Sequence, residues 1–285
     1  MRTRELYFNE AGCELEERRK RLFHDFPHAR IRRVYDWGVL LESVPLKRVS
    51  EPPTGYGYKG GAARLALTHA LGIEESYRAA RDIDLIRITA SVDAIDRAVA
   101  QKFMEEDVKH GNGVEGVRDF QEYLVTRDIT VNEVLYLQDR VIASYDAIQD
   151  CKNRALRPTR FALTQEQDSR NRISAKIIRF AAEAILAGNP PSSVTLASDE
   201  PLTQFNFLLQ LDRALSGGGR LAETYFREVA SRGLLPNSFS TITTLEKLSG
   251  ALKKLSKKEL KPFPKVSALS GSKQTLPAKK KLRMG

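Results

Sequence analysis

The stretch Asp82-Ile83-Asp84-Leu85-Ile86-Arg87-Ile88-Thr89 decides how the first half of this 285-residue chain is interpreted. Its acidic and aliphatic residues alternate, which is typical of a strand with one buried face. Because successive side chains point to opposite faces of a strand, the carboxylates of Asp82 and Asp84 would share one face. Two adjacent hard oxygen ligands suit Mg²⁺, which binds carboxylates together with substrate phosphates. Taken alone, such a pair is more often a solvent-facing strand edge.

A glycine pair, Gly60-Gly61, stands upstream of this strand and before a predicted helix over 62–71, which Gly72 ends. Glycine lets the backbone approach a phosphate closely, and the first amides of a helix are free to bind one. An isolated glycine pair is more simply a tight turn. The order of strand, glycine pair, helix and Asp-x-Asp strand is harder to obtain by chance, and it favours a triphosphate site.

The remaining pattern predicts an α/β protein with a small mixed sheet, followed by helices. We expect a helix from Ser91 to about Val108, a turn at 110–113, a helix-like run over 132–137, a strand at Val141-Ile142, a helix over 172–186, and helices over 201–255 broken by glycines 217–219. The predicted parts are an N-terminal extension (1–50), a head (51–160), a helical neck and body (161–260) and a flexible basic tail (261–285).

Composition is that of a globular protein, with 41% hydrophobic and 29% charged residues. The chain lacks a run of apolar residues long enough for a membrane span and an apolar segment near its start, so we expect a cytoplasmic protein without a membrane partner. The net charge of +10 is concentrated from Lys253 to the last residue, where ten Lys and one Arg accompany a single acid, Glu259. Both a polyanionic partner and a merely solvated tail fit this charge.

Three motifs follow one another between residues 58 and 157. The first is Tyr58-Lys59-Gly60-Gly61-Ala62-Ala63-Arg64, followed by Asp82-Ile83-Asp84. The second is Thr126-Arg127-Asp128-Ile129-Thr130-Val131-Asn132-Glu133. The third, after Val141-Ile142, is Asp150-Cys151-Lys152-Asn153-Arg154-Ala155-Leu156-Arg157. In this order they resemble the head domain of the class II tRNA nucleotidyltransferases and bacterial poly(A) polymerases, whose second motif reads Arg-Arg-Asp-Phe-Thr-Ile-Asn-Ala. The resemblance covers residues 56–185.

The resemblance implies a magnesium-dependent nucleotidyltransferase of the polymerase-beta-like superfamily, which transfers a nucleoside monophosphate from a nucleoside triphosphate to an RNA 3′ hydroxyl, as in tRNA 3′-end or poly(A) extension. Asp82 and Asp84 would be the catalytic ligands of two Mg²⁺ ions. The implied nucleotide-binding residues are Gly60, Gly61, Arg64, Arg127, Asp128, Asn132, Asp168, Arg172 and Arg179. Lys176 is a further candidate on the same predicted helix, and Asp119 and Glu122 are candidates for a third carboxylate.

This chain also departs from the family pattern. Leu65 and Thr126 replace an acid and the first Arg of a doublet, and Ala143-Ser144-Tyr145-Asp146-Ala147 replaces Asp-Pro-x-Gly-Gly. The family's base-reading motif, Glu-Asp-x-x-Arg, is matched by Asp168 and Arg172 only if one residue is inserted. The sequence therefore does not predict which base is transferred.

Three functions remain open from the sequence. The first is RNA extension, with RNA and a nucleoside triphosphate as partners. The second is a toxin or defence nucleotidyltransferase that modifies tRNA or protein. The third is a non-catalytic RNA-binding scaffold of the same fold, which the joint presence of the metal carboxylates, the glycine pair and Arg127-Asp128 disfavours. Neither the acceptor nor the oligomeric state is predicted.

Overall fold

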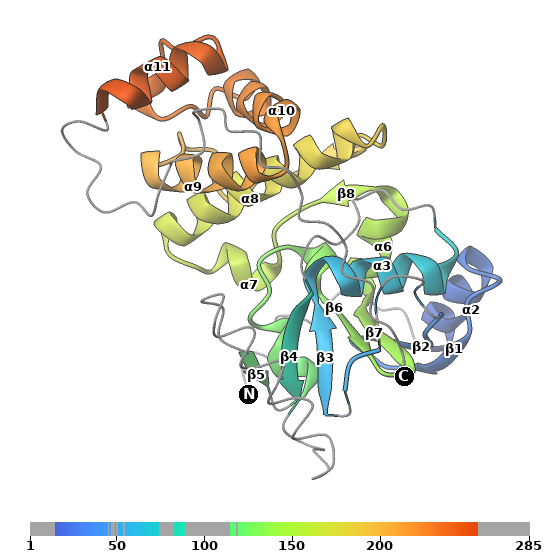
Figure 1. Cartoon of the computed structure of the whole chain (residues 1–285). Coiled ribbons are helices and arrows are strands. Elements are labelled where there is room, and N and C mark those ends of the chain that lie inside the picture. Colours follow the sequence, from blue (N-terminus) through green and yellow to red (C-terminus); the bar gives the residue numbers. More distant parts are fainter. Residues whose placement is uncertain are drawn as a thin grey trace, which may run out of the picture. The chain divides into compact units, whose positions relative to one another are not determined.

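The computed structural model describes residues 15–44, 46, 49, 51–53, 55–73, 83–88, 115–117 and 119–255. The chain forms two compact units, Met1–Thr241 and Ile242–Gly285. The first unit holds all of the strands and most of the helices described below (Figure 1). In the second unit the described element is the helix α11 (Leu245–Leu255).

A seven-stranded mixed sheet confirms the predicted α/β class. Its order is β1-β2-β7-β6-β3-β4-β5, and all neighbours are antiparallel except β4 and β5, which are parallel. The strands are β1 (Ile31–Val34), β2 (Gly38–Glu42), β3 (Tyr56–Lys59), β4 (Asp84–Ile88), β5 (Glu115–Val117), β6 (Val134–Leu137) and β7 (Arg140–Ser144). Strands β1 and β2 come from the expected N-terminal extension, yet β2 pairs with β7 along its whole length.

The run over 132–137, which we expected to be helical, is mostly the strand β6. Only Thr130–Asn132 forms a turn of 3₁₀ helix, η1. Val134 and Tyr136 belong to the core on one face of the sheet, and Leu135 belongs to the core on the other. A central strand buried on both faces is apolar throughout, so its sequence lacks the alternation that distinguishes a strand from a helix.

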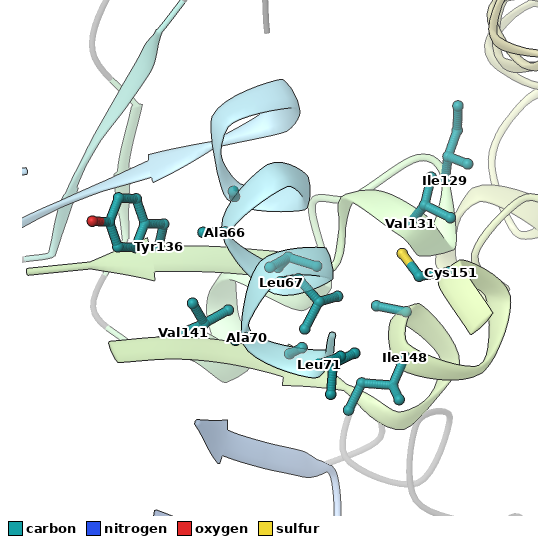
Figure 2. Close-up of a cluster of buried hydrophobic side chains, with 14 of the residues drawn as sticks. Ala66, Leu67, Ala70, Leu71, Ile129, Val131, Tyr136, Val141, Ile148 and Cys151 are labelled. Carbon is teal, nitrogen blue, oxygen red and sulfur yellow. The ribbon is translucent and has the colours of Figure 1, made fainter. Parts of the chain in front are cut away.

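The two faces of the sheet carry different helices. The helices α3 (Gly60–Leu71) and α6 (Tyr145–Asn153) cover one face, where Ala66, Leu67, Ala70 and Leu71 of α3 lie close to strand and α6 side chains such as Tyr136 and Ile148 (Figure 2). Gly72 ends α3 in the left-handed region, at φ 67°, as the sequence predicts. The short helix α5 (Phe120–Leu124) packs on the opposite face with Ile86 and Leu135.

Three long helices follow the sheet. These are α8 (Gln167–Leu186), α9 (Gln204–Ser216) and α10 (Gly219–Ser231), and they pack against one another. The helix α8 begins at Gln167 and not at the expected Arg172, and the additional residues at its start are mostly polar. Asn171, near the start of the helix, is buried, and its amide is satisfied because it donates to Pro201 O (3.0 Å) and accepts from Thr203 N (2.9 Å). A pattern based on apolar periodicity does not detect such turns.

Smaller elements join the sheet to these helices. The helix α7 (Arg160–Leu163) precedes α8, and the two-stranded parallel ribbon of β8 (Ala155–Leu156) and β9 (Ser193–Val194) links the end of α6 to the segment after α8. The remaining elements are α2 (Leu15–Asp25) and η2 (Asn237–Phe239).

Several expectations fall on residues that the structure does not describe. These are the helix from Ser91 to Val108, the turn at 110–113, the side chain of Asp82 and the basic tail from 261. The division into four domains likewise stays a prediction. None of the helices in the described ranges combines the length and apolar character needed to cross a membrane.

Candidate functional site

The glycine turn and the start of β4 lie side by side. Lys59 and Asp84 are partners in the antiparallel pair β3–β4, so Gly60, the first residue of α3, directly faces Asp84. Gly60 adopts φ +64°, and a Cβ placed on it would come within 3.0 Å of Asp84 Oδ2. Asp84 is exposed, and the missing side chain of Gly60 keeps the space beside its carboxylate open. The described part of the predicted metal site is therefore an exposed carboxylate beside a helix N-terminus.

A hydrogen-bonded network joins four of the candidate residues from three parts of the chain. Arg64 of α3 donates to Asn132 Oδ1, and Asn132 Nδ2 donates to Asp128 Oδ1 at 3.1 Å. Lys176 of α8 donates to Asp128 Oδ2. The Arg64 guanidinium also lies 4.8 Å from the ring centroid of Phe180. The structure thus brings Arg64, Asp128, Asn132 and Lys176 together, with Asp128 at the centre.

This network keeps Asp128 ionised. Burial alone would raise its pKa, but the charge and hydrogen bond of Lys176, the amide of Asn132 and the nearby Arg127 outweigh burial and lower it to about 2. A carboxylate held in this way accepts hydrogen bonds at any physiological pH. It is suited to a ligand that offers hydroxyl donors, such as a ribose.

The third motif supports the loop that carries Asp128. Arg157 Nε donates to Asp150 Oδ2 (2.8 Å), whose carboxylate also accepts from Thr130. Thr159 Oγ1 donates to Arg127 O (2.7 Å), and Thr159 N donates to Asp128 O (3.1 Å). The backbone from 127 to 130 is therefore clamped onto residues 157–159. This explains why the second and third motifs occur together: the third holds the second in place.

Arg127 belongs to a neighbouring network that the sequence did not predict. It donates to Glu115 Oε1, and Lys59 Nζ donates to Glu115 Oε2 at 2.7 Å. The Arg127 guanidinium also stacks 4.1 Å from the ring centroid of Tyr123. Burial opposes ionisation of Glu115, but these two cations lower its pKa below the usual range. The sequence signal for Glu115 was hidden because the strand β5 has only three residues.

The two acids considered as a third metal ligand are placed by α5. Asp119 caps this helix by accepting from Glu122 N at 2.9 Å, and Glu122 lies in its first turn. Glu115 is the register partner of Ile86 in β4, two residues along that strand from the predicted metal carboxylate of Asp84. No group of three metal-binding side chains occurs within the described ranges, which exclude Asp82.

The candidate residues of α8 form one stripe. Asp168, Arg172, Lys176 and Arg179 are spaced by four, four and three residues, which places them on the same side of a helix. Asp168 accepts from Asn206 Nδ2 (3.1 Å), and Arg179 binds Glu183 and donates to Gln210 Oε1 (2.9 Å). The side chain of Arg172 is exposed. Lys176 of this stripe donates to Asp128 in the loop of the second motif, so the stripe faces that loop at this position.

Glu133, which the sequence reasoning did not single out, is the most perturbed acid beside the site. It is 1% exposed and accepts from Ser144 Oγ at 2.5 Å. Burial raises its pKa to about 8, and Asp146 and Asp150 add to this, against the hydrogen bond from Ser144 and the charge of Arg157. At neutral pH the Glu133 carboxyl therefore carries its proton.

Glu133 should make the protein less stable as the pH rises. Folded Glu133 keeps a proton that unfolded Glu133 releases above its ordinary pKa of 4.5, so unfolding becomes easier between about pH 5 and pH 8 and then levels off. The expected loss is about 3–5 kcal/mol of unfolding free energy. Urea denaturation of the wild type and of Glu133→Gln at several pH values measures it. The variant should show a flatter profile, and identical profiles would contradict the assignment.

Comparisons with family models and with curated proteins give no match. Among solved structures, the fold is similar to a CCA-adding enzyme in complex with ATP, at 17% identity and a TM-score of 0.40, covering 71% of this chain and 53% of the other. It is also similar to the Thermotoga maritima CCA-adding enzyme complexed with tRNA-CCA, at 15% identity and a TM-score of 0.38, covering 71% and 52%. This chain spans about half the length of those enzymes. We therefore infer its reaction from its own residues.

Proposed function

We propose that this protein is a nucleotidyltransferase that transfers a nucleoside monophosphate from a nucleoside triphosphate to the 3′ hydroxyl of an RNA. The observation that carries the proposal is the convergence of the ordered motifs: Gly60 faces Asp84, and Arg64 of the same helix reaches Asp128 through Asn132. A helix N-terminus, an exposed carboxylate and an acid that could bind ribose thus lie along one helix. These are the parts that a triphosphate, a metal ion and a sugar require.

The amides of Gly60 and Gly61 would bind triphosphate oxygens, and Arg64 would add a positive charge one turn further along α3. Asp128 would accept from the ribose hydroxyls. Mg²⁺, held by Asp84 together with Asp82, would stabilise charge on the attacking and leaving oxygens. The 3′ oxygen bonds to the α-phosphorus, the bond from that phosphorus to the bridging oxygen breaks, pyrophosphate leaves, and the hydroxyl proton passes to water.

The test is incubation of the full chain with Mg²⁺, each α-labelled nucleoside triphosphate in turn, and total RNA. Label on RNA, resistant to protease and removed by ribonuclease, would support the proposal. Label confined to one tRNA class or to protein would instead favour a toxin or defence enzyme. Failure of every triphosphate to label RNA or protein, by a protein that still binds RNA, would favour the non-catalytic scaffold.

Lys176 should determine how well the enzyme selects ribose. Without its ammonium group Asp128 loses its main cation, so its carboxylate becomes less fixed and less readily ionised. For Lys176→Ala we expect the preference for ATP over dATP, measured as the ratio of the two kcat/KM values, to fall about tenfold, which corresponds to about 1.4 kcal/mol. Lys152→Ala, which breaks the exposed pair with Asp25, is the matched control. An unchanged ratio in Lys176→Ala would show that Asp128 does not read the sugar through this contact.

A further inference from the structure

Lys59, Asp84 and Glu115 project from one face of the sheet. Lys59 and Asp84 are register partners in the β3–β4 pair, and Glu115 is the register partner of Ile86, two residues along β4 from Asp84. Register partners share a face, and so do residues two apart on a strand, so the three side chains stand on the same side. Lys59 also directly precedes the turn at Gly60. The charged network around Glu115 therefore adjoins the proposed metal and triphosphate site.

Glu115 bridges two cations with separate oxygens. Lys59 Nζ donates to Oε2 at 2.7 Å, and Arg127 donates to Oε1. The Arg127 guanidinium is also held against the ring of Tyr123, whose centroid is 4.1 Å away. Burial opposes the charge of Glu115, yet the two cations lower its pKa, so the bridging carboxylate is ionised. One carboxylate thus fixes the separation of two positive groups, one from β3 and one from the second motif.

The bridge leaves donors on both cations. A lysine ammonium has three donors and an arginine guanidinium has five. Within the described residues, Lys59 donates to Glu115, and Arg127 donates through Nε and Nη2 to Glu115 and Thr126. The remaining Lys59 donors and Arg127 Nη1 can serve another acceptor. Both side chains reach solvent, with 22% and 12% of their surface exposed.

The acids near the two cations do not cancel their charge. Glu115 offsets one of the two. Asp128, which follows Arg127 in the chain, is offset by Lys176, and Asp84 is the proposed metal ligand. The acids of α5 pair with neither cation, and the carboxylate of Asp119 accepts from the amide of Glu122. One positive charge therefore remains beside the proposed metal site.

The network also bears on a departure from the resembled family. Where the second motif of that family begins Arg-Arg, this chain has Thr126-Arg127. Thr126 Oγ1 lies 3.1 Å from Glu115 Oε1, so the residue that replaces the first Arg contacts the carboxylate that Lys59 also binds. A second cation is thus present beside Arg127 although the doublet is incomplete, and it comes from β3.

We propose that Lys59 and Arg127, bridged by Glu115, bind the pyrophosphate part of the nucleoside triphosphate, and that Glu115 is a positioning residue that fixes the separation of the two cations. The inference rests on the proposed nucleotidyl transfer and adds Lys59 and Glu115 to its site. Two cations at a fixed separation suit the two linked phosphates, whose oxygens accept charge-assisted hydrogen bonds. Cations held in place before the ligand arrives lose little freedom on binding it.

The first experiment is isothermal titration of the full chain with inorganic pyrophosphate and Mg²⁺, without RNA. We expect the wild type to bind, with affinity about tenfold lower in Lys59→Met and at least about fivefold lower in Glu115→Gln. An amide has one acceptor oxygen and cannot bridge two cations, which outweighs the loss of a negative charge. Lys59→Arg keeps the charge and should stay within about threefold of the wild type. Asp139→Asn is the matched control, because Asp139 also bridges two cations, Arg32 at 2.7 Å and Arg140 at 2.8 Å, outside the site.

The second experiment is steady-state transfer to RNA, in which KM and kcat separate the possible roles of Glu115. Glu115→Gln should raise KM for the nucleoside triphosphate at least about fivefold and leave kcat within about threefold, with an unchanged Mg²⁺ requirement. A lower KM would show that Glu115 competes with phosphate for the two cations, and it would overturn the proposal. A large loss of kcat with a shifted Mg²⁺ requirement would make Glu115 a metal ligand, and it would overturn the proposal too.

Pyrophosphate binding requires neither RNA nor turnover, so it separates this inference from the proposed function. If the chain labels no RNA but binds pyrophosphate with this dependence on Lys59 and Glu115, the pyrophosphate site stands and the transfer reaction does not. If RNA is labelled while pyrophosphate affinity and KM are unchanged in both variants, only the pyrophosphate site is wrong. Absence of pyrophosphate binding by the wild type would also overturn it. Lys59→Met changes a partly exposed side chain and keeps the test valid if Glu115→Gln fails to fold.

Discussion

Asp84→Asn should lose at least about a thousandfold of nucleotide incorporation and keep its fold. The substitution removes one negative charge and leaves the shape of the side chain almost unchanged. Metal-assisted charge stabilisation in phosphoryl transfer is worth several kcal/mol, and each 1.36 kcal/mol is a factor of ten in rate. The measurement is single-turnover transfer of an α-labelled nucleoside triphosphate to the RNA that the wild type labels. Asp84 is exposed, so thermal unfolding should change little.

Asp119→Asn is the matched control for that experiment. Asp119 is also an acid near the strands β4 and β5, but its carboxylate caps α5. It should keep most of its activity and lose little stability, because an Asn side-chain oxygen caps a helix about as well as that of Asp. If Asp119→Asn and Asp84→Asn lost activity equally, Asp84 would have no special role.

Gly60→Ala should impair catalysis by at least about a hundredfold through a single methyl group. The new Cβ would meet Asp84 Oδ2 at 3.0 Å, so the carboxylate would have to move. A left-handed backbone also costs a non-glycine residue about 1–2 kcal/mol. Both effects fall on the turn that is proposed to bind the triphosphate. The measurement is kcat/KM for the nucleoside triphosphate, together with thermal unfolding.

Gly72→Ala separates the two effects. Gly72 has nearly the same φ, +67° against +64°, and a Cβ there would meet nothing within 4 Å. It should therefore lose a similar amount of stability and retain activity. Equal losses of activity in the two variants would show that backbone strain is responsible and that the approach of Gly60 to Asp84 is not.

The local features of the site could be predicted from the sequence. A glycine pair before a helix, a Gly at its end and an alternating strand are each determined by neighbours in the chain. The helix α3 forms over 60–71 where 62–71 was expected, and β4 covers 84–88 of the expected strand over 82–89. The strand β6 could not be predicted in the same way, because its burial on both faces depends on β3 and β7, which pair with it from either side.

Contacts between residues that are far apart in the chain could not be predicted from the sequence either. Lys176 and Asp128 are 48 positions apart, and their ion pair depends on the direction of α8 relative to the sheet. Glu133 and Ser144 meet because β6 and β7 form a tight antiparallel pair. Glu115 is on a strand too short to leave a pattern. In each case the residue types were visible but their partners were set by tertiary structure.

The ion pair between Lys176 and Asp128 also limits how the chain can be divided. A fragment that ends at residue 160 would keep Gly60, Asp84 and Asp128, but it would lack Lys176 and Phe180, against which Arg64 packs. Asp128 would then lack its principal counter-ion, and the Arg64 guanidinium would lose its contact with the Phe180 ring. The predicted head, separated from α8, would therefore lack part of the proposed site. Transplanting it onto another helical partner would require that partner to supply a cation at the position of Lys176.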